Sequence, residues 1–193
     1  MTRFYFVRHG TTDSNVKGIY YGRTDSALNG RGILQAKDLC QTFSLVDFDE
    51  IYTSPMKRCR DTVEIITTKK EIRVEEKLVE MDFGLWEGMH YTECMKIYPK
   101  EYENWCSDYK KYTPPNGEKY TDFYDRIYHF YHNVLKELQG NILIVSHKGV
   151  LQLLISLLLN EDDSLFWNFD FMPGKYSILE KELNHCTVKN LNI

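Results

Sequence analysis

The stretch Phe4-Tyr5-Phe6-Val7-Arg8-His9-Gly10 carries the clearest fold signal in this chain of 193 residues. Four consecutive apolar residues, bounded by Arg3 and Gly10, predict a short buried strand that ends on a cation and an imidazole. In an open α/β sheet, ligands bind in the crevice at the carboxyl ends of the strands. A strand with this ending therefore delivers a positive charge and a potential nucleophile to a ligand site. The alternative is a surface Arg-His pair in a turn, and the tripeptide alone does not separate the two interpretations.

The composition fits one globular domain, because 193 residues with 42% hydrophobic content suffice for a sizeable core. The sequence contains no run of 18 apolar residues and no signal-peptide pattern, so we expect a soluble, cytoplasmic protein with no membrane partner. Its net charge of −4 argues against nucleic acid as a partner. Five scattered cysteines without a CxxC pair predict neither a disulfide framework nor a zinc site. Residues 1–31 differ from the whole chain in the sign of their charge. Their five basic and two acidic side chains give a net charge of +3, which suits an anion pocket.

Strand and helix patterns alternate along the chain and predict a three-layer α/β/α sandwich with a mainly parallel sheet. Besides the first strand, we expect strands at 51–53, 72–74 and 141–145, with edge strands at 176–179 and 186–191. A first helix is expected over 30–43, with Asn29 as its cap and Cys40 facing inward. A second helix is expected to begin after Ser54, which would cap it. Two more are expected, one from Thr121 or Asp122 to Gly140 and one over 149–159.

Residues 81–120 are rich in aromatic and charged side chains and are too ordered in composition for a linker. We interpret them as an insertion that covers the active site, within a single domain spanning 1–193. Most of the tyrosines and tryptophans of this segment are expected to pack the insertion, and a subset is expected to form the wall of a pocket.

Polar side chains follow several predicted strands at the point where each strand ends. Ser54 and then Arg58 follow the second strand, and Ser146, His147 and Lys148 follow the strand at 141–145. Arginine matches phosphate oxygens bidentately, and helix N-termini favour anions. The set therefore predicts a site for a phosphoryl group.

In this order and spacing the motifs resemble the histidine phosphatase superfamily, which is also called phosphoglycerate mutase-like. The resemblance covers almost the whole chain through Arg8-His9-Gly10 with Thr12 and Asn15, 24–32, 53–62, 80–88 and Ser146-His147. Within the superfamily the chain is most similar to the α-ribazole phosphatases of cobalamin biosynthesis, through 104–108, 115–118, 145–155 and 166–169.

The resemblance implies that His9 is the nucleophile and forms a phosphohistidine, which splits one difficult displacement into two easier ones. We expect a backbone carbonyl to fix the tautomer of its ring. Arg8 and Arg58 would clamp the phosphoryl oxygens, Asn15 would donate a further hydrogen bond, and His147, if protonated, would share the charge. Cations replace magnesium in this scheme, so no metal or other cofactor is expected.

Glu80 is implied as the acid that protonates the leaving oxygen and then as the base that activates water. Asp82 is the alternative acid, but the place of Glu80 before Phe83-Gly84 matches the family pattern. Arg23, Thr24 and Lys148 are further candidates for substrate binding. Lys148 departs from the family, which commonly has a small or amide residue there; it either adds a phosphate contact or points away.

Other signals favour structural interpretations. Gly30-Arg31-Gly32 lacks the third glycine of a dinucleotide fingerprint. His129 and His132 lie three apart on a predicted helix but have no third ligand near them in the sequence, so we expect surface residues and not a metal site. Lys57, Arg60 and Glu87 are expected to be solvated or to form ion pairs.

The sequence thus predicts a metal-independent phosphomonoesterase of small molecules, and the family resemblance favours α-ribazole 5′-phosphate as substrate. The first alternative is a broader sugar-phosphate or phosphoglycerate phosphatase or mutase, although residues 96–119 offer lysines and no arginine. The second is a noncatalytic protein that binds phosphate compounds. The oligomeric state is left open between a monomer and a homodimer formed through an edge strand.

Overall fold

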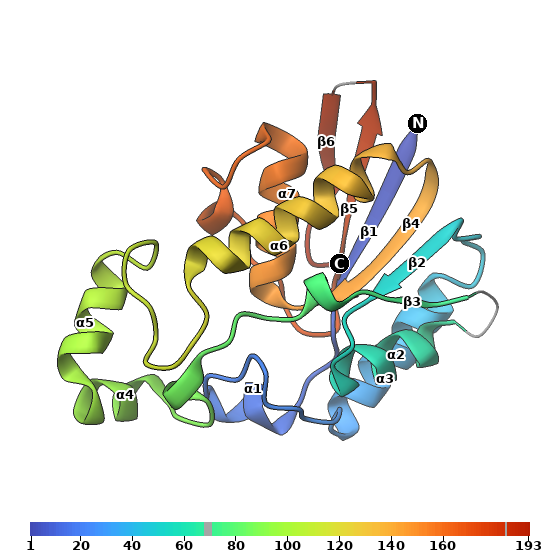
Figure 1. Cartoon of the computed structure of the whole chain (residues 1–193). Helices are drawn as coiled ribbons and strands as arrows, with labels where there is room; N and C mark the ends of the chain where they lie inside the picture. Colours follow the sequence, from blue (N-terminus) through green and yellow to red (C-terminus); the bar gives the residue numbers. More distant parts are fainter. Residues whose placement is uncertain (68–70, 184) are drawn as a thin grey trace.

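The computed structural model describes residues 1–67, 71–183 and 185–193, in which six strands form one mixed sheet with the order β3-β2-β4-β1-β5-β6 (Figure 1). The strands are β1 (Thr2–Arg8), β2 (Glu50–Thr53), β3 (Arg73–Val74), β4 (Gly140–Ser146), β5 (Tyr176–Glu182) and β6 (His185–Asn190). The first four run parallel, whereas β5 and β6 are antiparallel additions. The predicted mainly parallel sheet is confirmed, but β5 lies between β1 and β6 and is not an edge strand.

Helices cover both faces of this sheet, which makes the predicted three layers (Figure 1). The helices are α1 (Asp13–Lys17), α2 (Gly30–Thr42), α3 (Lys57–Ile66), α4 (Tyr91–Ile97), α5 (Pro99–Ser107), α6 (Tyr120–Asn133) and α7 (Lys148–Asn160). Helices α2 and α3 pack on one face, and α6 and α7 pack on the other. Short 3-10 turns lie at Glu76–Leu78, Gly84–Trp86, Leu135–Glu137 and Phe166–Asn168. No helix within the described residues combines the length and the apolar character needed to cross a membrane.

The strands have an apolar side chain on both faces because each face is covered by helices. Phe4, Phe6 and Ile144 pack with the buried side chains of α6 and α7, while Tyr5 and Val7 pack with those of α2 and α3. This alternation with a period of two explains why the strand at the amino terminus is apolar without interruption.

The parallel strands end at the same level, which brings together the residues that follow them. Arg8 at the end of β1 pairs with Ser146 in β4, and Thr53 at the end of β2 pairs with Val145. The pairing continues one residue further, since the backbone N–H of His9 donates to the carbonyl of Ser146 at 3.0 Å. The carboxyl edge of β2, β4 and β1 is therefore one continuous platform for polar side chains.

Three local predictions were wrong. Asn29 does cap α2, but Ser54 does not cap α3, which starts at Lys57 without a side-chain cap. The helix expected to reach Gly140 ends at Asn133 and gives way to a 3-10 turn. Cys40 is exposed, because the inward position on its turn of α2 belongs to the neighbouring Leu39.

Residues 81–120 contain α4 and α5, which stand apart from the sandwich in Figure 1. Trp86 is fully buried in this segment. Its indole ring lies 5.3 Å from the ring of Tyr102, 5.5 Å from Trp105 and 6.0 Å from Tyr20. The aromatic side chains of this segment thus form a cluster that also includes Tyr20 from outside the segment.

Candidate active site

Two buried histidines form the centre of the platform at the carboxyl edge of the sheet. His9 follows β1 and His147 follows β4, and each is at most 2% exposed. Their ring centroids lie 5.3 Å apart, although the residues are far apart in the sequence. The structure therefore brings these two imidazoles together.

The ring of His9 is held in one tautomer. Its Nδ1 donates to the carbonyl oxygen of Gly10 at 2.8 Å, so Nε2 carries the lone pair. Burial, together with the positive charges of Arg8 and Arg58, holds the pKa of His9 well below its usual value. The imidazole is therefore neutral at physiological pH, as a nucleophile must be.

The guanidinium of Arg58 is fully buried and fixed by three hydrogen bonds. Its Nη1 and Nη2 donate to the carbonyl oxygens of Thr24 and Gly22 at 3.0 and 2.8 Å, and its Nε donates to Nδ1 of His147 at 3.2 Å. The ring of Tyr21 covers the guanidinium at 4.7 Å. A guanidinium has five N–H groups, so two donors remain for a ligand.

His147 is a neutral hydrogen-bond acceptor in this arrangement. A guanidinium only donates, so Nδ1 of His147 carries no proton, and Nε2 donates to Oγ of Ser54 at 2.8 Å. Burial and the charge of Arg58 lower the pKa of His147 well below its usual value. The neutral form, and not the protonated form considered from the sequence, fits these hydrogen bonds.

Arg8 presents an unused donor inside the site. Its Nη1 donates to the carbonyl oxygen of Phe171 at 2.7 Å, whereas its buried Nε has no hydrogen-bond partner among the described residues. Burial lowers the pKa of Arg8. A buried N–H without a partner is costly, and an anion bound beside it removes that cost.

Glu80 reaches the site, whereas Asp82 does not. The two carboxylate oxygens of Glu80 accept from the backbone N–H groups of Met81 and Gly149, each at 3.1 Å. Asp82 instead accepts from the N–H of Gly84 at 2.8 Å and stabilises a turn. Of the two carboxylates weighed from the sequence, Glu80 is the one placed beside the N-terminus of α7.

Asn15 is oriented by the first turn of α1. Its side-chain oxygen accepts from the backbone N–H of Thr12 at 3.0 Å, which leaves the amide N–H groups to point away from that bond. Arg23 and Thr24 are exposed. The guanidinium of Arg23 lies 3.9 Å from the carboxylate of Glu118, and Thr24 holds Arg58 through its main chain. Arg23 is thus paired with Glu118, and Thr24 contributes to the site through its main chain.

Lys148 lies at the rim of the site and is paired. Its Nζ is 2.5 Å from a carboxylate oxygen of Asp170, and this hydrogen bond lowers the pKa of Asp170. The charge of the lysine is thus paired with Asp170 and not directed at the histidines without a partner.

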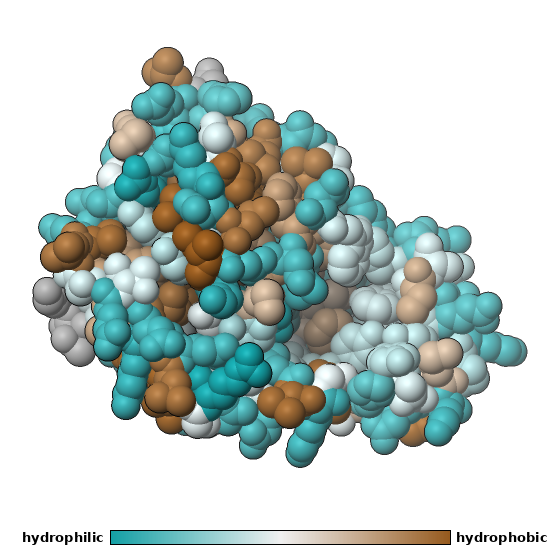
Figure 2. Space-filling view, turned by 180° about the vertical axis from the view of Figure 1, so that it is seen from behind, coloured by the Kyte–Doolittle hydropathy of each residue, from teal (hydrophilic) through white to brown (hydrophobic). Residues whose placement is uncertain are grey.

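A cavity of about 310 Å³ opens next to Glu80. Figure 2 shows a hollow between the region of α4 and α5 and the rest of the molecule. Most of the wall is aromatic, and the few polar groups lie at Glu80 and on the first turns of α7. The cavity is lined by Tyr20, Glu80, Met81, Phe83, Trp105, Tyr109, Tyr120, Phe123, Lys148, Gly149, Gln152, Phe166 and Trp167.

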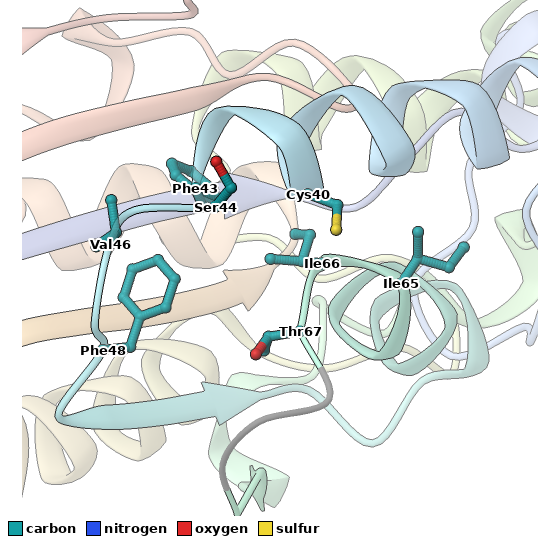
Figure 3. A pocket seen from close by; sticks show the side chains of 8 residues that line it. All are labelled: Cys40, Phe43, Ser44, Val46, Phe48, Ile65, Ile66 and Thr67. Carbon is teal, nitrogen blue, oxygen red and sulfur yellow. The ribbon is translucent and has the colours of Figure 1, made fainter.

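A second cavity, of about 250 Å³, lies beside the amino end of β2 (Figure 3). Its lining includes Phe43 and Phe48, and it shares no residue with the cavity next to Glu80. Because the histidines lie at the carboxyl ends of the strands, this second cavity is separate from the candidate active site.

Three residues take roles in the site that the sequence did not predict: Ser54 was expected as a helix cap, Glu87 as a solvated or ion-paired residue, and Tyr21 had no assignment. Ser54 binds His147, and Tyr21 covers Arg58. Glu87 accepts from the backbone N–H groups of Gly22 and Thr24 at 2.6 and 2.8 Å and so shapes the loop that holds Arg58. Burial opposes its ionisation, yet these hydrogen bonds outweigh burial and lower the pKa of Glu87. The one sequence feature that pointed to Glu87 was its position in the 80–88 motif.

Ion pairs account for the other basic residues that the sequence left as structural. Lys57 pairs with Asp61 at 2.9 Å, and Arg60 lies 3.6 Å from Glu64. In the described part of the chain, no three His, Cys, Asp or Glu side chains come together as a metal site, and His129 and His132 belong to no such group.

Comparison with known proteins shows to which family the chain belongs. Residues 4–193 match the pattern of the histidine phosphatase superfamily (branch 1). The chain is 34% identical to the adenosylcobalamin/alpha-ribazole phosphatase of Escherichia coli K12, over 98% of this chain and 95% of that protein. It is 33% identical to phosphoserine phosphatase 1 of Hydrogenobacter thermophilus, over 100% and 93% of the two chains. The crystal structure of the alpha-ribazole phosphatase from Shigella flexneri superposes with a TM-score of 0.91 at 33% identity, covering 99% of this chain and 96% of that one. The chain therefore belongs to the histidine phosphatase superfamily and is a phosphatase.

Proposed function

We propose that this phosphatase hydrolyses α-ribazole 5′-phosphate to α-ribazole and inorganic phosphate through a phosphohistidine on His9. The observation that carries the substrate assignment is the aromatic cavity next to Glu80. The chemistry is assigned to His9, Arg8, Arg58, Glu80 and His147, as the sequence predicted.

In the first step, Nε2 of His9 attacks phosphorus while the bond to the ester oxygen breaks. The lone pair on Nε2 is available because Nδ1 donates to Gly10. Arg8 and Arg58 stabilise the charge that spreads over the phosphoryl oxygens, and an amide N–H of Asn15 adds a donor. Glu80 acts as the general acid and gives a proton to the leaving oxygen, so the free alcohol departs.

In the second step, water attacks the phosphohistidine and restores His9. Glu80, now a carboxylate, takes the proton of the attacking water, and phosphate leaves with the oxygen of that water. His147 acts on Arg58. Nδ1 of His147 accepts from Nε of Arg58 and so sets the plane of the guanidinium and the direction of its two remaining donors. We assign positioning, and not charge, as the main role of His147 in the free enzyme.

The cavity favours a leaving group that is large, flat and mostly apolar. α-Ribazole is a benzimidazole base on a ribose, and a volume of about 310 Å³ with aromatic walls suits it. The leaving groups of phosphoserine and phosphoglycerate are small and charged, and would need charged partners. Lys148, the one cation in the lining, is already paired with Asp170.

The test compares kcat/KM for α-ribazole 5′-phosphate, phosphoserine, 3-phosphoglycerate and p-nitrophenyl phosphate, with EDTA present. We expect turnover of the first and last substrates in EDTA, with α-ribazole 5′-phosphate preferred. Rapid acid quenching with ³²P-labelled substrate is expected to trap an acid-labile label on wild-type protein and none on His9→Ala.

Three outcomes contradict parts of the proposal separately. Preference for phosphoserine or phosphoglycerate would overturn the substrate assignment. Absence of the acid-labile label during turnover would overturn the role of His9. Failure to hydrolyse any ester, combined with binding of phosphate compounds, would support the noncatalytic alternative.

A further inference from the structure

One polar side chain in the wall of the aromatic cavity has no part in the mechanism above. Gln152 is 3% exposed and lies on α7, three residues beyond Gly149. It lines the cavity together with Lys148 and Gly149. A buried amide in an apolar wall is costly unless both its donor and its acceptor are used.

The amide of Gln152 is fixed in one orientation. Its Nε2 donates to the carbonyl oxygen of Phe169 at 2.5 Å, and because that carbonyl only accepts, the amide cannot be reversed. The side-chain oxygen Oε1 is consequently directed away from Phe169. Among the described residues no group donates to Oε1, and this oxygen is not one of the fully buried atoms left without a partner, so it is accessible from the cavity that Gln152 lines.

The segment that holds this amide is itself held at three successive residues. Phe169 accepts from Gln152, Asp170 binds Lys148, and the carbonyl of Phe171 accepts from Arg8. The anchoring makes the position of Oε1 a fixed feature of the cavity and not a consequence of a mobile loop.

We propose that Oε1 of Gln152 accepts a hydrogen bond from a hydroxyl group on the leaving alcohol. The proposal rests on the function assigned above and makes the sugar of the substrate, and not only its aromatic base, a determinant of specificity. The backbone N–H of Gly149 binds Glu80, and Gln152 follows three residues later, a rise of about 4.5 Å along α7. The ester oxygen and the ring hydroxyls of a ribose 5′-phosphate are separated by a similar length, so an ester oxygen beside Glu80 places a ribose hydroxyl near Oε1.

The experiment measures kcat/KM of wild type, Gln152→Met and Ser156→Ala on four substrates. The substrates are α-ribazole 5′-phosphate, its 2′-deoxy and 3′-deoxy analogues, and p-nitrophenyl phosphate. Gln152→Met keeps the shape of the side chain and removes the acceptor. Ser156→Ala is the matched control, because Ser156 is buried on the same helix, bonds to Asp162 at 2.7 Å and does not line the cavity.

We expect Gln152→Met to lower kcat/KM for α-ribazole 5′-phosphate about fivefold, as for the loss of one neutral hydrogen bond. Turnover of p-nitrophenyl phosphate, which has no hydroxyl, should be unchanged. Wild type should discriminate against one of the two deoxy analogues by a similar factor, and this discrimination should vanish in Gln152→Met. Ser156→Ala should change all four values by the same factor.

Equal losses on all four substrates in Gln152→Met would overturn the proposal, because they indicate a structural role only. Absence of discrimination between ribose and both deoxy substrates in wild type would overturn it without any variant. A wild type that hydrolyses p-nitrophenyl phosphate but not α-ribazole 5′-phosphate would instead overturn the substrate assignment, and this proposal with it.

Discussion

Nε of Arg58 donates a hydrogen bond to Nδ1 of His147, and this contact joins the first turn of α3 to the end of β4. It fixes the proton of His147 on the opposite nitrogen, where Ser54 accepts it. The second histidine is therefore neutral and orients a cation.

Arg58→Lys keeps the charge but loses this geometry. We expect kcat/KM to fall about 100- to 1000-fold, because a lysine cannot hold His147 and two carbonyls while facing the phosphoryl group. The carbonyls of Gly22 and Thr24 lose their donor, at a cost of about 1–3 kcal/mol in the free energy of unfolding.

Steady-state kinetics and urea unfolding test this expectation. Arg60→Lys is the matched control, because Arg60 lies on the same helix in an exposed ion pair with Glu64. Its effect on kcat/KM should be about twofold or less. Equal activities of Arg58→Lys and wild type would show that charge alone suffices.

Buried, neutral His9 makes stability depend on pH. Its pKa is well below 6.5 in the folded protein, so below pH 6.5 the unfolded chain binds a proton that the folded protein does not. The stabilisation from His9 is thus fully present above pH 6.5 and is lost as the pH falls toward the folded pKa. Between pH 7.0 and 5.5 we expect this group to lower the free energy of unfolding by about 1 kcal/mol.

The measurement is urea unfolding at both pH values for wild type and His9→Asn. Titrating groups that the two proteins share cancel in the comparison, so wild type should lose about 1 kcal/mol more than the variant. Identical pH dependence in the two proteins would mean that His9 titrates normally in the folded state.

Gly149→Ala tests the position of Glu80 without removing any hydrogen-bonding group. An added Cβ would lie 2.7 Å from a carboxylate oxygen of Glu80, so the acid must move, although the N–H of residue 149 remains. We expect kcat to fall about 10- to 100-fold, because displacing a catalytic group by even about 1 Å lowers the rate by this order.

Gly30→Ala is the control for this variant, because nothing lies within 4 Å of a Cβ at that helical position. Kinetics with p-nitrophenyl phosphate and thermal unfolding would show a normal kcat and stability equal to or above wild type for Gly30→Ala. Full activity of Gly149→Ala would remove Glu80 from the proposed acid-base role.

Lys148→Met separates the two roles considered for this lysine. Its ion pair with Asp170 is largely exposed, with side-chain exposures of 41% and 64%, so the pair contributes little to stability. If the lysine stays with Asp170 during turnover, KM for α-ribazole 5′-phosphate should change by about threefold or less. A tenfold rise in KM would show that Lys148 leaves Asp170 and binds the substrate.

The sequence predicted the sheet, its parallel majority and the two histidines because these follow from local patterns. An apolar strand covered on both faces is visible in Phe4 to Val7, and parallel strands that end at one level bring together whatever follows them. His9, Arg58 and His147 each follow or lie just beyond such a strand, so their convergence was predictable.

The tertiary structure alone decided which atoms of these residues face one another. Ser54 was predicted as a helix cap, but its hydroxyl binds His147 because β2 and β4 are neighbours in the sheet. The direction of the Gln152 amide depends on the carbonyl of Phe169, which comes from a different part of the chain. Residue types and strand ends are local properties that a sequence displays, whereas tautomers and amide orientations are set by partners that only folding brings within reach.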